Sequence, residues 1–343
     1  MRSVAALSLV LLTLPLNAQT VSTRCGTEEV RVGTRTIDLL LLGCGEGFAD
    51  NVLWHLDRAD STDGSLNSKV TRTATGKGAV VYLCDTGVMR DHDEFARADG
   101  SVVIGSIAVN GFGSDCPAGR NPALDPCWKT DAALSIYSHG TATASMIAGR
   151  NTGTAPDAKI VSVFMETVGT DIDGWIRTFD AIIHHAFDAG TPQFKTGIIS
   201  MSFVPNYASA KDPNFPAFEK KMREMIAEVD AGGNADPSGK RFLFVTVAGN
   251  HLEGNGDQCD KDMNTNLFPA GLGASIDGLI TVGGIDETNR VWDRSCRGAA
   301  VDILAPASDL LVATANADEP TAGGRVAVFD GIFAVSGRRA GRR

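Results

Sequence analysis

The sequence predicts an α/β fold with a mainly parallel central sheet, and three observations support this prediction. Five short runs are continuously apolar or β-branched, which is typical of strands covered on both faces. Two other segments place apolar residues at three- and four-residue spacing, which indicates amphipathic helices. The two kinds of segment alternate along the chain, as they do in parallel sheets whose strands are joined by helices.

The predicted strands share an unbroken apolar or β-branched character over six or seven residues. They are AVVYLC (79–84), KIVSVFM (159–165), GIISMS (197–202), FLFVTVA (242–248) and LITVGG (279–284). Functional sites of parallel sheets form at the carboxyl ends of the strands. The residues that follow each run are therefore the first candidates for a functional role.

Two helices are predicted between these strands. The first spans residues 173–189, and Gly190 ends its apolar stripe. The second carries an apolar stripe over residues 218–229. His184 and His185 adjoin in the first helix, but adjacent helical side chains point about 100° apart. We therefore expect no metal site at this histidine pair.

Composition and charge narrow the class of protein. The 343 residues are 43% hydrophobic and 21% charged, which is ordinary for a globular protein. The net charge of −10 argues against nucleic-acid binding, which needs a basic surface.

Residues 1–18 are expected to be a secretory signal peptide, with Arg2 before an apolar core and Ala18 at the cleavage point. A membrane anchor is the alternative, but the apolar run is short for spanning a bilayer. We expect a secreted, extracellular monomer with no membrane partner.

Seven cysteines in a secreted protein predict disulfides, and their odd number leaves one thiol over. Cys84 lies inside an apolar run, so we expect it to be the free, buried thiol. The other six allow many pairings, of which we expect the sequence-local set. That set is Cys25–Cys44, Cys116–Cys127 and Cys259–Cys296.

Three polar residues occupy positions where a functional site is expected. Asp85 follows the first strand within DTG, and Asn250 follows the fourth strand within GN. His139 opens a helix of small residues within SHGTATASMIAG. Each alone fits a plain structural role, as a turn or cap residue. Together they are the groups of acyl transfer: Asp85 orients His139, His139 takes a proton from a serine, and Asn250 donates to the oxyanion.

These segments resemble the motifs of the subtilisin-like serine proteases, the subtilases. VVYLCDTGV is similar to that family's Asp motif, SHGTATASMIAG to its His motif, ISMS to its substrate-lining strand and FVTVAGN to its oxyanion segment. The order Asp, His, Asn is also that family's order. The resemblance covers about residues 48–337. It implies a subtilisin-like three-layer fold and a secreted serine endopeptidase that acts on peptides or proteins.

The same resemblance implies which residues line the substrate site. They lie at or directly after the ends of the third and fourth predicted strands and are Ser200, Ser202, Phe203, Val204, Ala248 and Gly249. Phe203 and Val204 replace the Leu-Gly that is usual in the family. We therefore expect a narrowed pocket for the substrate side chain.

The nucleophilic serine is missing from its expected place. In the family it belongs to a Ser-Gly-Thr-Ser type segment that opens a buried helix, and AVSG (334–337) is similar to the first half of that segment. Arg339 then stands where the serine is expected. Ser336 lies three residues early, roughly 10 Å along an extended chain, and a shift of about 1 Å can already cost a hundredfold in rate. We therefore expect a domain cut off within this motif, with its C-terminal part missing and inactive as written. A non-catalytic relative that binds peptides or a protein partner is the alternative.

The remaining segments receive simpler expectations. Residues 19–47 are Gly-rich and polar and are expected to form a short N-terminal extension. Residues 48–337 form the incomplete peptidase domain, and 338–343 form an Arg-rich tail outside the family pattern. No cofactor is expected. DHDEFARAD (91–99) is acidic enough for the structural calcium that the family often binds, but we expect a solvated loop there.

Overall fold

The structure is a computed structural model that describes most of the central part of the chain. The described residues are 19–22, 30–32, 35–37, 53–60, 65–72, 74–85, 87–88, 92–97, 104–107, 139–164, 172–202, 215–251, 259, 264–265, 267–314 and 325–329. Within these ranges, no helix combines the length and the apolar character needed to cross a bilayer.

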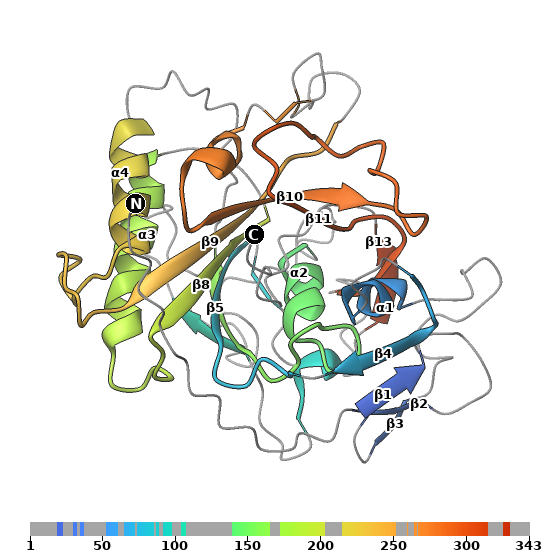
Figure 1. Ribbon diagram of the computed structural model, residues 1–343. Helices are drawn as coiled ribbons and strands as arrows, with labels where there is room; N and C mark the ends of the chain where they lie inside the picture. The colour runs from blue at the N-terminus through green and yellow to red at the C-terminus, as the bar shows by residue number, and fades with distance from the viewer. Residues whose placement is uncertain are drawn as a thin grey trace, which may run out of the picture.

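A seven-stranded parallel sheet runs through the centre of the molecule in the order β11-β10-β9-β8-β5-β7-β6 (Figure 1). The strands are β5 (Val80–Asp85), β6 (Ile104–Ile107), β7 (Lys159–Phe164), β8 (Thr196–Met201), β9 (Arg241–Val247), β10 (Leu279–Ile285) and β11 (Ile303–Pro306). All five predicted strands are confirmed, and their bounds differ from the expected ones by at most one residue at each end.

The two edge strands, β6 and β11, were not predicted from the sequence. Each is only four residues long, and β6 (IGSI) also lacks the continuous apolar character of the inner strands. β11 also ends at Pro306, which has no backbone N–H to donate and is tolerated because it stands on an edge strand. Short edge strands therefore carry little local signal.

One face of the sheet is covered by the helices α3 (Ile172–Phe187) and α4 (Phe215–Ile226). Aromatic rings join these layers: the ring centroid of Phe179 lies 5.2 Å from that of Phe218 and 5.4 Å from that of Phe244 in β9. Both predicted helices are confirmed. α4 ends three residues before its expected end because Val229 instead forms two backbone hydrogen bonds with Lys240, at 2.9 and 3.0 Å.

The opposite face carries the helix α2 (His139–Ala148) (Figure 1). α2 also packs against β12 (Leu310–Thr314). α2 consists largely of small residues, so it packs closely against both neighbours. The Ser145 hydroxyl in α2 accepts a hydrogen bond from the Ala313 amide at 2.9 Å. α2 is therefore fixed on both sides, and its first residue has a defined position at the sheet edge.

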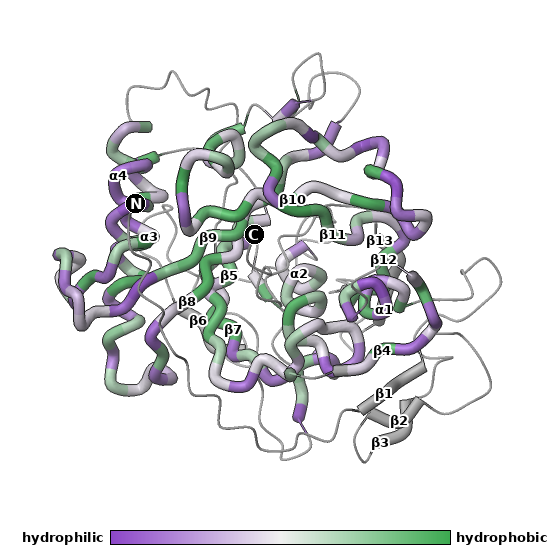
Figure 2. The backbone as a smooth tube through the Cα atoms, in the orientation of Figure 1, coloured by the Kyte–Doolittle hydropathy of each residue, from purple (hydrophilic) through white to green (hydrophobic). Residues whose placement is uncertain are grey.

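The hydropathy of the chain follows this layering. Figure 2 shows the inner strands as predominantly hydrophobic, whereas α3 and α4 mix hydrophobic and hydrophilic residues along their length. This contrast is expected when helices cover both faces of a parallel sheet and keep only their outer sides in water.

Smaller elements complete the described structure. They are α1 (Trp54–Asp60), the 3₁₀ helices η1 (Asp93–Phe95) and η3 (Ala270–Ser275), and the strands β1 (Gln19–Ser22), β2 (Val30–Val32), β3 (Arg35–Ile37), β4 (Lys69–Arg72) and β13 (Arg325–Phe329). β1, from the expected N-terminal extension, pairs antiparallel with β4. α1 was not predicted, and the Trp54 indole N–H in this helix donates to the Ser308 carbonyl at 3.2 Å.

The cysteine predictions are confirmed where the structure describes the residues. Cys259 and Cys296 form a disulfide, and Cys84 is a free, buried thiol. The expected pairs Cys25–Cys44 and Cys116–Cys127 lie outside the described residues, as do the expected signal peptide (1–18) and tail (338–343).

Candidate active site

Asp85 is the last residue of β5, and its side chain is almost completely buried. Side chains alternate between the faces of a strand, so Asp85 shares its face with Leu83. Leu83 packs against α2 in one cluster of the core. The strand therefore directs the Asp85 carboxylate toward the helix that begins with His139.

His139 is the first residue of α2 and meets this carboxylate directly. Its Nδ1 atom lies 2.8 Å from Oδ1 and 3.0 Å from Oδ2 of Asp85. The carboxylate accepts the Nδ1–H and thereby fixes the ring tautomer, which leaves Nε2 free of its proton. The His139 side chain is 26% exposed, so the pair combines a buried carboxylate with a ring that solvent reaches.

A glycine permits this close approach of α2 to the end of β5. Gly140 follows His139, and a Cβ atom at this position would clash with the carbonyl oxygen of Gly87 in the turn after Asp85. The sequences DTG and HG are thus packed against each other.

The pKa of His139 lies above its ordinary value of 6.5. Burial disfavours the imidazolium and lowers the pKa, but the charge of Asp85 and its hydrogen bond to the ring both raise it and together prevail. The ring therefore binds a proton more strongly than a free histidine does, as a general base paired with a carboxylate should.

Asn250 lies at the same edge of the sheet, three residues beyond the end of β9. β5 and β9 are both parallel neighbours of β8, so their carboxyl ends lie at one edge with the end of β8 between them. Gly249 adopts a left-handed backbone conformation (φ +104°), which glycine tolerates without steric cost. The sequence prediction that Asp85, His139 and Asn250 share one edge is consistent with this topology.

Four of the residues predicted to line the substrate site also lie at this edge. Ser200 and Ser202 are at and just beyond the end of β8, and Ala248 and Gly249 follow β9. The side chains of Ser200 and Ala248 are fully buried, and that of Ser202 is 6% exposed. Their contact with a substrate stays a prediction. Phe203, Val204, Ser336 and Arg339 lie outside the described residues.

Within the segment 91–99, the described residues 92–97 differ from the solvated loop that we expected. His92 and Phe95 are buried, and Glu94 is only 3% exposed. Glu94 accepts hydrogen bonds from the Asn151 amide N–H (3.1 Å) and side-chain Nδ2 (2.5 Å). It also accepts bonds from the Thr152 N–H and hydroxyl, both at 3.2 Å. The expectation of a solvated loop was wrong because this carboxylate binds the turn that follows α2.

The sequence did not reveal the contacts of Glu94, which lie at the end of α2 opposite to His139. Its partners lie 57 and 58 residues further along the chain, so no local pattern connects them. Both Glu94 oxygens accept hydrogen bonds from N–H or O–H donors of this turn. Within the residues that the structure describes, no three His, Cys, Asp or Glu side chains gather as a metal site.

Comparison with known proteins shows the family to which the sequence is similar. The model of the subtilase family matches residues 76–327. The chain is 30% identical over 276 residues to a cuticle-degrading serine protease of Orbilia oligospora, covering 78% of this chain and 51% of that protein. It is 27% identical over 253 residues to subtilisin-like protease 1 of Pseudogymnoascus destructans, covering 74% of this chain and 49% of that protein.

A similar fold is found among solved structures. A cold-adapted subtilisin-like serine proteinase matches with a TM-score of 0.50 and 23% identity, covering 81% of this chain and 78% of that one. This likeness confirms the predicted three-layer α/β fold. The chain spans about half the length of the curated relatives it matches.

Proposed function

The chain belongs to the subtilase family, and we propose that its Asp85–His139 pair and Asn250 form the catalytic apparatus for hydrolysing peptide bonds by acyl transfer. The observation that carries this proposal is the contact of both Asp85 oxygens with Nδ1 of His139. This contact leaves Nε2 as the atom that takes a proton from an attacking serine hydroxyl. The Asn250 side chain would donate to the oxyanion of the tetrahedral intermediate.

We propose further that the 343-residue chain does not complete this reaction. The attack needs a serine oxygen, and Arg339 occupies the position where the family resemblance places that serine. In the missing step the serine Oγ bonds to the scissile carbonyl carbon, its proton moves to Nε2 of His139, and the same proton later leaves with the amine. Without this oxygen, the rest of the apparatus can only bind and polarise a peptide.

A labelling experiment tests both parts. The purified chain should neither hydrolyse a peptide p-nitroanilide above background nor react with a fluorophosphonate probe. A chain continued after Gly337 with Thr-Ser and a helix of the family type should react, and His139→Ala should abolish the reaction. His184→Ala is the matched control, because His184 is an exposed residue of α3. Stoichiometric labelling of the unmodified chain at Ser336 would contradict the assignment.

The second candidate is a non-catalytic relative that binds peptides or a protein partner at the same edge. The paired Asp85 and His139 favour catalysis, because a binding protein has no need of an oriented general base. Peptide affinity separates the two: under the catalytic proposal His139→Ala leaves affinity nearly unchanged while abolishing turnover in the serine-containing chain. Absence of turnover in the serine-containing chain, together with a loss of peptide affinity in His139→Ala, would favour the binding protein.

We propose that the protein is secreted and acts as a monomer on peptides or proteins. A fungal relative named as a cuticle-degrading protease supports a protein substrate. N-terminal sequencing of protein from the culture medium should find a mature chain that begins after Ala18. Retention of residues 1–18 in the mature protein would overturn the secretion proposal.

A further inference from the structure

The turn that carries Asn250 is held from outside β9 by a second segment of the chain. The Cys296 amide donates to the carbonyl of Gly249 at 3.0 Å. The His251 amide donates to the carbonyl of Arg294 at 2.6 Å. The residues before and after Asn250 are therefore both fixed by backbone hydrogen bonds to one external segment.

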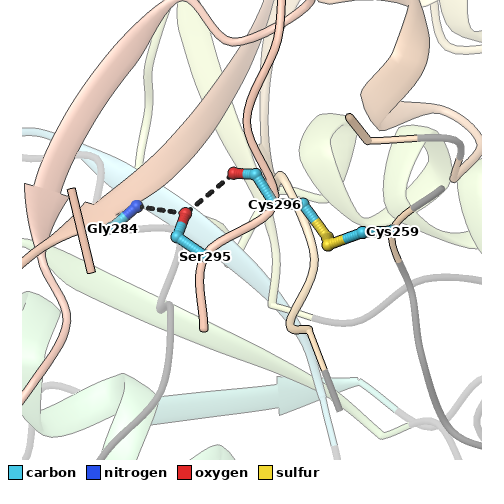
Figure 3. Close-up of a disulfide and its surroundings, with 4 residues drawn as sticks. All are labelled: Cys259, Gly284, Ser295 and Cys296. Carbon is cyan, nitrogen blue, oxygen red and sulfur yellow. Dashed lines mark hydrogen bonds between the residues drawn. A yellow bond between two sulfur atoms is a disulfide. The ribbon is translucent and has the colours of Figure 1, made fainter. Parts of the chain in front are cut away.

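Ser295 lies opposite Asn250 in this arrangement, and the two residues form an antiparallel bridge. Ser295 is fully buried. Its hydroxyl accepts a hydrogen bond from the Gly284 amide at 2.9 Å and donates to the carbonyl of Cys296 at 2.8 Å (Figure 3). Ser295 thereby ties the segment to β10, a strand of the central sheet.

The disulfide ties the same segment from its other side. Cys296 is disulfide-bonded to Cys259, which lies 37 residues earlier in the chain (Figure 3). Cys259 also pairs with Thr265 in an isolated antiparallel β-bridge. Thr265 in turn donates its amide hydrogen to the carbonyl of Arg297 at 2.9 Å. A closed set of contacts therefore surrounds the cysteine that hydrogen-bonds to Gly249.

We infer that residues 294–297, together with the Cys259–Cys296 disulfide, are positioning residues for the oxyanion donor Asn250. The inference rests on the proposed function and deepens it, because it assigns the part of the fold that sets the geometry of one catalytic group. We refer to residues 294–297 as the brace. Neither the hydroxyl of Ser295 nor the disulfide touches a substrate; both act through the turn at Asn250.

The turn needs such support because Gly249, with its positive φ, is a conformationally free residue. An oxyanion donor stabilises the intermediate only at about 2.7–3.1 Å, and loss of one such donor costs about 10²–10³ in turnover. A turn held by β9 alone would leave Asn250 free to move by more than this tolerance. The brace removes that freedom before a substrate arrives.

Hydrogen exchange in the full 343-residue chain tests the brace without any need for catalysis. The amides of His251 and Cys296 should be protected in the native protein. The double change Cys259→Ser and Cys296→Ser should raise their exchange by about tenfold or more, and Ser295→Ala should do so to a smaller extent. Exchange in α2 and β5 should not change.

Ser275→Ala is the matched control, since its exposed hydroxyl donates to the Leu272 carbonyl at 2.9 Å within η3. This variant should leave the exchange of both reporter amides unchanged. Unchanged protection in the Cys259/Cys296 double variant would overturn the inference. Equally raised exchange throughout the sheet would also overturn it, because the disulfide would then act on the whole fold.

Peptide binding tests the link to Asn250. A peptide that ends in a carboxylate is compared with the same peptide ending in the primary alcohol. The affinity of the carboxylate peptide divided by that of the alcohol peptide reports hydrogen-bond donation from Asn250 to an anionic oxygen. Asn250→Ala and Ser295→Ala should both reduce this ratio, whereas the affinity of the alcohol peptide should stay constant. A ratio that falls in Asn250→Ala but not in Ser295→Ala or the cysteine double variant would refute the positioning role. If neither peptide binds, the proposed function fails, and the exchange data still decide whether the brace holds the turn.

Discussion

Both carboxylate oxygens of Asp85 face a single ring nitrogen, Nδ1 of His139, at 2.8 and 3.0 Å. The carboxylate is buried at the end of a central strand, and the ring stands at the first residue of a helix that is fixed on two sides. The geometry is therefore set by the fold and does not require a substrate or a nucleophile. The pairing of Asp85 with His139 can therefore be measured in the 343-residue chain.

The protonation of His139 should depend on Asp85. In the wild-type chain the His139 ring should titrate with a midpoint above 6.5, as followed by NMR of its carbon-bound protons. In Asp85→Asn the charge is lost and burial remains, so the midpoint should fall below 6.5. The shift should be specific, so Asp157→Asn, at an exposed residue, should leave the midpoint unchanged. A midpoint that is equal in wild type and Asp85→Asn would contradict the pairing.

The same pKa direction determines how this pair affects stability. Because the folded-state pKa of His139 is raised, the folded protein binds the proton more tightly than the unfolded chain. The contribution to the free energy of unfolding is fully present below about pH 6.5 and is lost as the pH rises through the folded pKa. Any stability advantage of the wild type over Asp85→Asn should therefore shrink on raising the pH through that value.

Glu94 should contribute strongly to the free energy of unfolding, because its buried carboxylate accepts hydrogen bonds from Asn151 and Thr152. Glu94→Gln replaces one acceptor oxygen with an NH₂ group and places donor against donor at Asn151 or Thr152. Leaving buried donors unsatisfied should cost about 2–3 kcal/mol in the free energy of unfolding, measured by denaturant titration. Glu219→Gln, at a surface pair with Arg223, should cost less than about 1 kcal/mol. Similar losses for the two variants would show that the Glu94 contacts contribute little.

The inner strands of the central sheet could be predicted from the sequence alone. β5, β7, β8, β9 and β10 were predicted because a strand covered on both faces must be apolar throughout. β6 was missed because an edge strand need not be apolar throughout, and β11 because its apolar run is only four residues long and ends in proline. α1 was also missed, since its seven residues are too few to display a helical period.

The candidate site was predicted where chemistry is local and missed where it depends on the fold. Asp85 and Asn250 follow apolar strands, so their positions could be located from the chain alone. The contacts of Ser295, which lies opposite Asn250, depend on segments brought together only by folding, and a single sequence shows no sign of them. The same holds outside the site for the burial of Glu94. The Cys259–Cys296 pairing was predicted from proximity in the sequence, which was an expectation among many alternatives.

The aromatic layer beneath α3 and α4 should dominate the stability of that face. Phe179 is fully buried and contacts the rings of Trp175, Phe218 and Phe244. Phe179→Ala should cost about 3–5 kcal/mol, because it removes both apolar burial and packing contacts and leaves a cavity. Ile303→Ala, at a residue 40% exposed on β11, is the control and should cost under about 1 kcal/mol. Comparable denaturation midpoints for the two variants would mean that this layer is not packed as described.

The Cys84 thiol should be inert in the folded protein. Burial raises its pKa, and the neighbouring Asp85 charge raises it further, so the reactive thiolate is almost absent at neutral pH. Iodoacetamide should therefore leave Cys84 unmodified in native protein and alkylate it fully in denaturant, as read by peptide mass spectrometry. The same non-reducing map should contain the linked Cys259–Cys296 peptides, which provides an internal control for intact disulfides. Rapid alkylation of Cys84 in native protein would show that β5, the strand that contains Cys84, opens to solvent. A disulfide that includes Cys84 would instead show that β5 is not the buried central strand on which the position of Asp85 depends.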